Sequence, residues 1–232
     1  ILGEELVITS TPLTPNRAVN SEQLGLFDAA ELTQPIGNED ATEYKTFESE
    51  KPSYHLIQTP QERAELLELL LEQASICFDT ETTEIDSLRA DLVGFSFSYK
   101  AKEAFYVPTP LTYEEAKAIV AEFKPIFEHT GIEKIGHNVK YDIQMLHRYG
   151  VEFKGPLFDT MIAQYLINPE AKQGMDFMAE VYLGYKPISI ESLIGKKGKG
   201  QGNMGDLSAE DIYQYACEDA DITFQLKEIL AP

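Results

Sequence analysis

The sequence contains no tryptophan, only two cysteines and four histidines, and about half as many basic as acidic residues. Cys77 and Cys217 do not make a disulfide framework or a cysteine-based metal cluster, so we expect both to be small buried residues in a protein of the reducing cytoplasm. The histidines do not form a zinc-binding pattern. No apolar run approaches the roughly 20 residues that a membrane-spanning helix requires.

Basic residues are scarce: 19 Lys and Arg stand against 39 Asp and Glu, for a formal net charge of −20. Proteins that bind nucleic acid usually present a basic footprint, so this balance predicts weak binding of a polynucleotide by the chain alone. Part of the excess lies in residues 1–52, which hold ten acids and three bases. Bound divalent cations would offset a further part wherever carboxylates gather.

Residues 1–52 mix Thr, Pro, Asn and Glu without a sustained hydrophobic period, which predicts a flexible linker. Residues 53–232 are expected to form the folded domain, and 43% of the whole sequence is hydrophobic, enough to supply a core. The chain begins with Ile and shows no signal peptide, so we expect a piece of a longer protein.

The hydrophobic pattern of residues 53–232 predicts an α/β domain with one mixed sheet. Strands are expected at 54–58, 75–81, 92–99, 104–107 and 132–135, and the close succession of the second, third and fourth fits an antiparallel meander. Helices are expected near 60–72, 112–128, 138–149, 159–167, 174–183 and 208–230. Asp159 is interpreted as the cap of its helix.

Two carboxylates stand where the strand predicted at 75–81 ends. Side chains alternate across a strand, so Asp79 and Glu81 point to the same face, about 7 Å apart along the chain. Two anions held so close require a cation, and carboxylate oxygens suit hard ions such as Mg²⁺. An isolated pair of this kind is more often a solvated strand end, so a cation site requires further carboxylates elsewhere in the chain.

The helix near 138–149 supplies a further carboxylate. Asn138 occupies its cap position, and Asp142 lies about one turn later on the same face. Taken alone, a cap followed by an exposed aspartate would be ordinary.

A third acidic element lies in the helix at 208–230, whose apolar positions form a seam that must face the core. The seam consists of Ile212, Tyr215, Asp219, Ile222, Leu226 and Ile229. A lone carboxylate at Asp219 would be costly to bury unless it were paired or bound to metal, and no Lys or Arg shares the seam. Tyr215, one turn earlier, projects toward the same spot. Glu218 and Asp221 point off the seam, so we expect them to meet solvent or pair at the surface.

These motifs resemble, in order and approximate spacing, those of the DEDD exonuclease superfamily in its tyrosine subclass. They are Asp79-Thr80-Glu81, residues 138–142 (Asn-Val-Lys-Tyr-Asp) and residues 215–219 (Tyr-Ala-Cys-Glu-Asp). Residues 135–142, 158–161 and 215–226 further resemble the 3′–5′ proofreading exonuclease domain of bacterial (family A) DNA polymerase I. The resemblance covers roughly residues 54–230. It implies a ribonuclease-H-like fold, with a mixed sheet flanked by helices, and a polymerase domain after residue 232.

The resemblance also implies a reaction. The 3′-terminal phosphodiester of DNA would be hydrolysed to release nucleoside 5′-monophosphates, as proofreading in replication and repair requires. Four ligands of two divalent cations, Mg²⁺ with Mn²⁺ or Zn²⁺ as substitutes, are implied: Asp79, Glu81, Asp142 and Asp219. Tyr215 would orient the attacking water. Six residues are candidates for contact with the single-stranded 3′ end: Thr80, Ile85, Asn138, Lys140, Tyr141 and Met161. For Ile85 and Met161 a core role is an equal alternative.

Two alternatives stay open. The chain is also consistent with an RNA 3′-trimming nuclease of the same superfamily, or with a non-catalytic module that binds a DNA end or a sliding clamp. Residues 23–27, from Gln23 to Phe27, resemble the short motif with which bacterial replication proteins bind that clamp. The apolar residues of this motif would otherwise pin the linker onto the domain.

Overall fold

The computed structural model describes residues 43–198 and 200–231. Six strands form one sheet in the order β1-β4-β3-β2-β5-β6. Their bounds are Ser53–Leu56 (β1), Ser75–Thr82 (β2), Leu92–Lys100 (β3), Glu103–Pro108 (β4), Glu133–Gly136 (β5) and Leu157–Asp159 (β6). β2, β3 and β4 form the predicted antiparallel meander, and the other strands add to it in parallel. The predicted α/β class with one mixed sheet is therefore confirmed.

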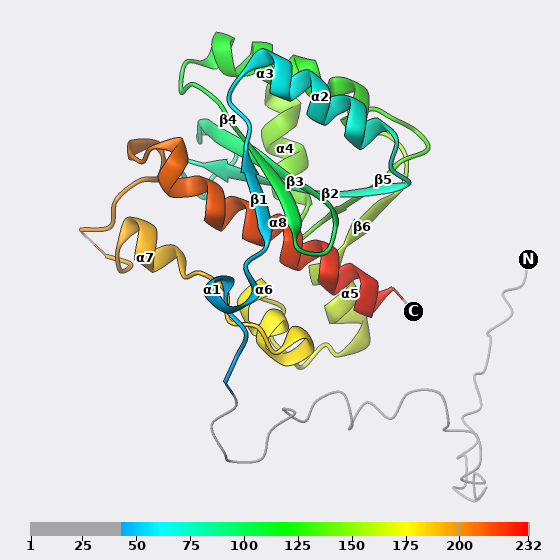
Figure 1. The fold of residues 1–232 in the computed structure, drawn as a ribbon, viewed down its shortest axis with the longest axis vertical. Helices are drawn as coiled ribbons and strands as arrows, with labels where there is room; N and C mark the ends of the chain where they lie inside the picture. Colours follow the sequence, from blue (N-terminus) through cyan, green and yellow to red (C-terminus); the bar gives the residue numbers. More distant parts are fainter. Residues whose placement is uncertain (1–42, 199, 232) are drawn as a thin grey trace, which may run out of the picture. The chain divides into compact units, whose positions relative to one another are not determined.

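Helices cover both faces of this sheet (Figure 1). They are α1 (Phe47–Glu50), α2 (Pro60–Leu71), α3 (Tyr113–Phe127), α4 (Lys140–Arg148), α5 (Thr160–Ile167), α6 (Met175–Met178), α7 (Ile190–Ile194) and α8 (Ala209–Leu230). A π-helical turn, η1 (Ala179–Leu183), and a 3-10 turn, η2 (Met204–Asp206), complete the set. Within the described ranges, no helix combines the length and the apolar character needed to cross a membrane.

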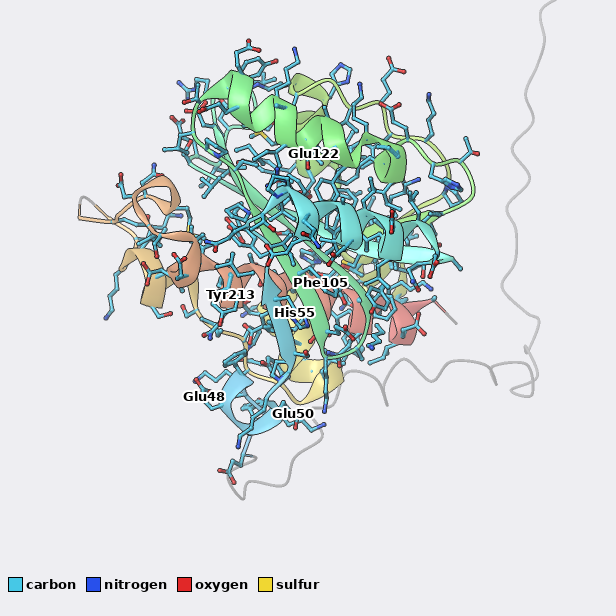
Figure 2. The ribbon with its side chains drawn as sticks, turned by 45° about the horizontal axis from the view of Figure 1, so that its top comes forward. Glu48, Glu50, His55, Phe105, Glu122 and Tyr213 are labelled. Carbon is cyan, nitrogen blue, oxygen red and sulfur yellow. The ribbon has the colours of Figure 1, made fainter. Side chains whose placement is uncertain are left out.

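One face of the sheet packs against α2, α3 and α4 through an aromatic core. Its fully buried phenylalanines are Phe78, Phe95, Phe97, Phe123 and Phe127. The rings of Phe95 on β3 and Phe123 on α3 meet edge to face, with centroids 5.2 Å apart. Above this core, Arg63 of α2 forms an ion pair at 2.7 Å with Glu122 of α3, which Figure 2 labels. The core holds β2 and β3 rigidly from this side.

The long helix α8 lies along the opposite face (Figure 1), where Ala216 and Cys217 pack with Tyr106 of β4. Gly94 of β3 permits this packing, because a Cβ there would lie 2.3 Å from the Tyr106 hydroxyl oxygen. Neighbouring residues of a strand point to opposite faces, so β2 turns Asp79 and Glu81 toward α8. The sheet thus separates an aromatic layer from a layer that contains carboxylates.

β1 forms one edge of the sheet, where the ring of His55 stacks on that of Phe105 of β4 with centroids 5.0 Å apart (Figure 2). Just before β1, residues 43–52 carry helix α1, which lies within the range assigned to the linker. Lys45 forms a β-bridge with Tyr185, so this part of the chain is attached to the domain. Residues 1–42 lie outside the described residues, so the linker stays a prediction for them.

Further details differ from the predicted elements. β6 and α7 were not predicted, because segments of three and five residues are too short to show a periodic pattern. Ile229, placed in the buried seam of the last helix, is 43% exposed, while Leu230 is buried.

Candidate active site

Three of the four predicted carboxylates meet between β2 and α8. Asp79 and Glu81 of β2 and Asp219 of α8 each offer an oxygen atom, and these atoms all lie within 4.8 Å of one another. Glu81 and Asp219 are each only 7% exposed. Residues about 140 positions apart thus form one acidic cluster, defined here as Asp79, Glu81 and Asp219.

Asp142 lies beside this cluster but is turned toward Thr80. The main-chain N–H and the hydroxyl of Thr80 both donate to Oδ1 of Asp142, at 3.1 and 2.5 Å. Thr80 points to the α4 side of the sheet, whereas Asp79 and Glu81 point to the α8 side. Asp142 therefore approaches from the other face of β2 and is not among the three mutually close carboxylates.

Burial raises the pKa of all four carboxyl groups, because their charged forms lose hydration. It raises the pKa of Asp79 to about 7 and holds the other three pKa values well above their usual range. Repulsion between the carboxylates raises the pKa values of Glu81, Asp142 and Asp219 further. In the described ranges, no Lys, Arg or His forms an ion pair with any of the four.

The cluster has the chemistry of a divalent cation site. Its hard carboxylate oxygens suit such an ion, and positive charge would relieve their repulsion. Oε1 of Glu81 is buried and has no hydrogen-bond partner among the described residues. The same holds for the hydroxyl of Ser96, which stands opposite Asp79 in the register of β2 and β3. Two unpaired buried polar atoms at one place fit a hydrated cation, because buried polar groups normally have partners.

Tyr215 lies one turn before Asp219 on α8 and is partly buried. The charge of Asp219 raises the pKa of the Tyr215 phenol well above its usual range, and burial and the charge of Glu81 add to this effect. The phenol therefore stays protonated near neutral pH. It can donate a hydrogen bond into the acidic cluster.

The candidates for substrate contact differ in their exposure to solvent and in their hydrogen-bond partners. Ile85 is 91% exposed in the loop after β2, which excludes the core alternative for it. Lys140 is exposed at the start of α4, and Met161 is partly buried near the start of α5. Both donors of Thr80 are directed at Asp142, which favours a supporting role for this residue over substrate contact.

Asn138 and Tyr141, near the start of α4, lie in environments that the sequence did not predict. Asn138 does not cap α4: it has a left-handed φ of 58°, and Val139 takes the cap position without a side-chain hydrogen bond. The hydroxyl of Tyr141 lies 2.6 Å from the Thr82 hydroxyl and donates to the carbonyl of Glu84. Tyr141 therefore ties α4 to the loop that carries Ile85.

The expectation that Glu218 and Asp221 meet solvent or pair at the surface is wrong. Both are buried, and Glu218 accepts hydrogen bonds from the Tyr185 hydroxyl at 2.5 Å and the Ile188 N–H at 2.6 Å. Asp221 accepts from the Tyr54 hydroxyl and the Lys102 N–H, both at 2.8 Å. The helical pattern places both side chains off the seam. Only the fold shows that β1 and the segment after η1 cover that side of α8.

Sequence comparison gives a family for this chain. The family described as 3′-5′ exonuclease matches residues 54–232. DNA polymerase I of Borreliella burgdorferi is 36% identical over 213 residues, a match that covers 90% of this chain and 22% of that protein. The chain spans about a fifth of the length of the curated relatives it matches.

Solved structures share the fold at low sequence identity. Brucella melitensis NrnC with bound Mg²⁺ is 19% identical with a TM-score of 0.57, over 77% of this chain and 79% of that one. Escherichia coli RNase D, an exoribonuclease involved in structured RNA processing, is 20% identical with a TM-score of 0.58, over 77% of this chain and 44% of that one. These likenesses confirm the ribonuclease-H-like fold. The family match over residues 54–232, together with the sequence identity to DNA polymerase I, shows that the chain belongs to the 3′–5′ exonuclease family of DNA polymerase I, a family of hydrolytic nucleases.

Proposed function

We propose that this chain is a metal-dependent proofreading exonuclease domain that shortens the 3′ end of single-stranded DNA and releases nucleoside 5′-monophosphates. The observation that supports this most strongly is the acidic cluster, whose three carboxylates lie within 4.8 Å of one another in a chain of the 3′–5′ exonuclease family. A terminal phosphodiester is a small anionic target, and only a frayed single strand could bring it to so buried a site.

Two divalent cations, Mg²⁺ with Mn²⁺ or Zn²⁺ as substitutes, would lower the pKa of the attacking water and stabilise the charge on the entering and leaving oxygens. Asp79, Glu81 and Asp219 are the proposed ligands nearest to one another, and Asp142 is the fourth. Raised carboxyl pKa values mean that protons compete with cations for these oxygens. Cation binding should therefore weaken as pH falls.

Tyr215 has the proposed role of orienting the attacking water. Its phenol stays protonated, so it acts as a hydrogen-bond donor rather than as a base. Ile85 would contact the terminal bases from the loop after β2, because an apolar side chain exposed beside a polar site offers a surface for a base face. Asn138, Lys140, Tyr141 and Met161 are proposed contacts with the sugar, phosphate or base of the 3′ end.

The test is degradation of a 5′-labelled single-stranded DNA oligonucleotide in the presence of Mg²⁺ or Mn²⁺. The proposal requires stepwise shortening from the 3′ end, nucleoside 5′-monophosphate as product, and loss of activity in EDTA. Asp219→Ala should abolish the shortening while the circular dichroism spectrum is kept. Binding of the oligonucleotide without shortening would contradict the proposal and support a non-catalytic module.

An RNA 3′-trimming activity is the second candidate, favoured by the fold that the chain shares with RNase D. Matched DNA and RNA oligonucleotides of one sequence decide between them. The proposal requires a higher kcat/KM for DNA than for RNA. The reverse order would identify an RNA-trimming nuclease with the same metal chemistry.

We also propose that residues 53–232 act as the exonuclease domain of a longer polypeptide that contains a polymerase domain, since the relatives are DNA polymerases I and the chain spans about a fifth of their length. Residues 1–42 would be a linker, while residues 43–52 are attached to the domain through the bridge of Lys45 with Tyr185. Residues 23–27 lie outside the described residues, so binding of a sliding clamp stays a prediction. Binding of a purified bacterial clamp to this chain, and its loss with Phe27→Ala, would test it.

A further inference from the structure

Asp159, at the end of β6, accepts four main-chain hydrogen bonds. Its Oδ1 caps α5 by accepting from Met161 N at 2.9 Å and Ile162 N at 3.3 Å. The same carboxylate also reaches the segment before α4, where Oδ1 accepts from Asn138 N at 3.1 Å and Oδ2 from Val139 N at 3.0 Å. One side chain therefore binds the first turn of α5 and the two residues that precede α4.

Helix α4 has no cap of its own. Val139 occupies its cap position and makes no side-chain hydrogen bond. The amides at a helix start lack main-chain partners and need acceptors from elsewhere. Asn138 adopts a φ of 58°, a left-handed conformation that costs energy for a residue with a side chain. The turn into α4 therefore depends on the carboxylate of Asp159.

The residue after Asp159 reinforces this connection. The buried hydroxyl of Thr160 donates to the carbonyl of Gly136 at 3.3 Å and lies 2.9 Å from Nδ1 of His137. Gly136 is also tightly enclosed, because a Cβ there would lie 2.9 Å from Cγ2 of Val139. The turn at 136–139 is thus held by Asp159 and Thr160 on one side and by close packing on the other.

This turn joins two functional segments. Asp142 follows it in the first turn of α4, where Thr80 binds the carboxylate. Asn138 and Met161, both proposed to contact the 3′ end, are two of the four residues whose amides Asp159 binds. We infer that Asp159 is a positioning residue for the nuclease reaction, holding the start of α4 so that Asp142 stays bound to Thr80 beside the acidic cluster and Asn138 keeps its place before α4. This inference rests on the proposed function.

Two substitutions separate positioning from simple helix capping. Asp159→Ser keeps an effective cap for α5 but lacks the second oxygen that reaches Val139. Asp159→Ala removes both functions. Thr59→Ala is the matched control, because Thr59 caps α2 on the far side of the aromatic core, and its loss should lower Tm by about 2–4 °C.

The readouts are Tm, kcat and KM on single-stranded DNA, and the dissociation constant for Mn²⁺. We expect Asp159→Ser to stay close to the wild-type Tm while kcat falls on the order of 10²-fold, as a displaced catalytic group does, and Mn²⁺ binds more weakly. Thr59→Ala should lower Tm but leave kcat and Mn²⁺ affinity unchanged. Asp159→Asn should recover part of the lost kcat, because one of its two terminal atoms can still accept.

Wild-type kcat and Mn²⁺ affinity in Asp159→Ser would overturn the inference and leave Asp159 as a cap of α5. The inference would also be overturned if kcat and Mn²⁺ affinity fall only in proportion to Tm, by the same amounts as in Thr59→Ala. If the wild-type chain does not shorten DNA at all, the proposed function fails instead. In that case Mn²⁺ affinity of the Asp159 variants still decides whether this residue positions Asp142.

Discussion

Thr80 donates two hydrogen bonds to a single oxygen of Asp142, from its main-chain N–H at 3.1 Å and from its hydroxyl at 2.5 Å. Thr80 stands between Asp79 and Glu81 in β2, so this contact fastens α4 to the strand that carries the first two acids. The fourth carboxylate is therefore located by a hydrogen bond across the strand. Repulsion from its neighbours would otherwise move it away.

Removing the Thr80 hydroxyl should weaken both fold and activity. Thr80→Val keeps the shape but leaves the buried Asp142 oxygen with one donor fewer, which should lower the free energy of unfolding by about 1–3 kcal/mol. We expect kcat to fall as well, because Asp142 is no longer held in one orientation. Urea denaturation and steady-state kinetics measure the two effects. Thr109→Val, which loses a buried hydroxyl bond to Leu92 O elsewhere, should lower stability but leave kcat unchanged.

Substitution of Asp219 should affect stability in opposite directions with and without metal. In EDTA, Asp219→Asn should raise the free energy of unfolding by on the order of 1–3 kcal/mol, because it removes a buried repulsive charge. When the Mg²⁺ concentration is 100 times the dissociation constant, the free energy of unfolding of the wild-type chain should rise by about 2.7 kcal/mol, and that of the variant by much less. Exonuclease activity should be lost throughout. An equal Mg²⁺ effect on both proteins would contradict the assignment of Asp219 as a ligand.

The metal-free protein should lose stability as pH rises. The pKa of Asp79 is raised to about 7, and those of Glu81, Asp142 and Asp219 are also raised well above their usual range, so the folded state binds more protons than the unfolded state above about pH 4. The free energy of unfolding in EDTA should therefore decrease from about pH 5 to about pH 8, through the folded pKa of Asp79. Urea titrations at several pH values measure this slope.

Mg²⁺ should flatten the same pH profile, because a bound cation stabilises the ionised carboxylates. Burial also raises the pKa of Glu218 to about 7, so this residue likewise lowers the free energy of unfolding as pH rises. Mg²⁺ should not remove this contribution. Asp219→Asn should also reduce the slope in EDTA. Stability that increases over this pH range in EDTA would show that the carboxylates are paired in a way that the structure does not contain.

Tyr215→Phe should separate catalysis from metal binding. The substitution removes the phenol donor without altering the carboxylates, and loss of one such group typically costs about 10²-fold in rate. We expect kcat to fall while the Mn²⁺ dissociation constant and Tm change little. The control is Tyr213→Phe, on the same helix outside the acidic cluster, which should keep full activity. Weakened Mn²⁺ binding in Tyr215→Phe would instead assign Tyr215 a role in holding the cation site.

Much of the fold was predictable from local chemistry. Strands β2, β3 and β4 and helices α3 and α8 carry strong hydrophobic patterns, and α2 begins with a capping box formed by Thr59 and Glu62, so their positions followed from the residues. β6 and α7 did not, because both are too short to show a period. The sequence also contained no indication that Asp159 binds the segment before α4 or that the Ser96 hydroxyl is buried beside Asp79, since a cap and an alternating strand residue look ordinary in a sequence.

The sequence by itself determined which residue types could hold a cation and in what order they occur, because strand alternation and helical periodicity place Asp79, Glu81 and Asp219 on predictable faces. Only the tertiary structure decided that Asp142 reaches β2 from the other face through Thr80, and that Asp159 supports the start of α4 from 20 residues away. It also buried Glu218 and Asp221. The physical reason is that periodicity specifies a side chain's direction within its own element, whereas its partners depend on how distant elements pack.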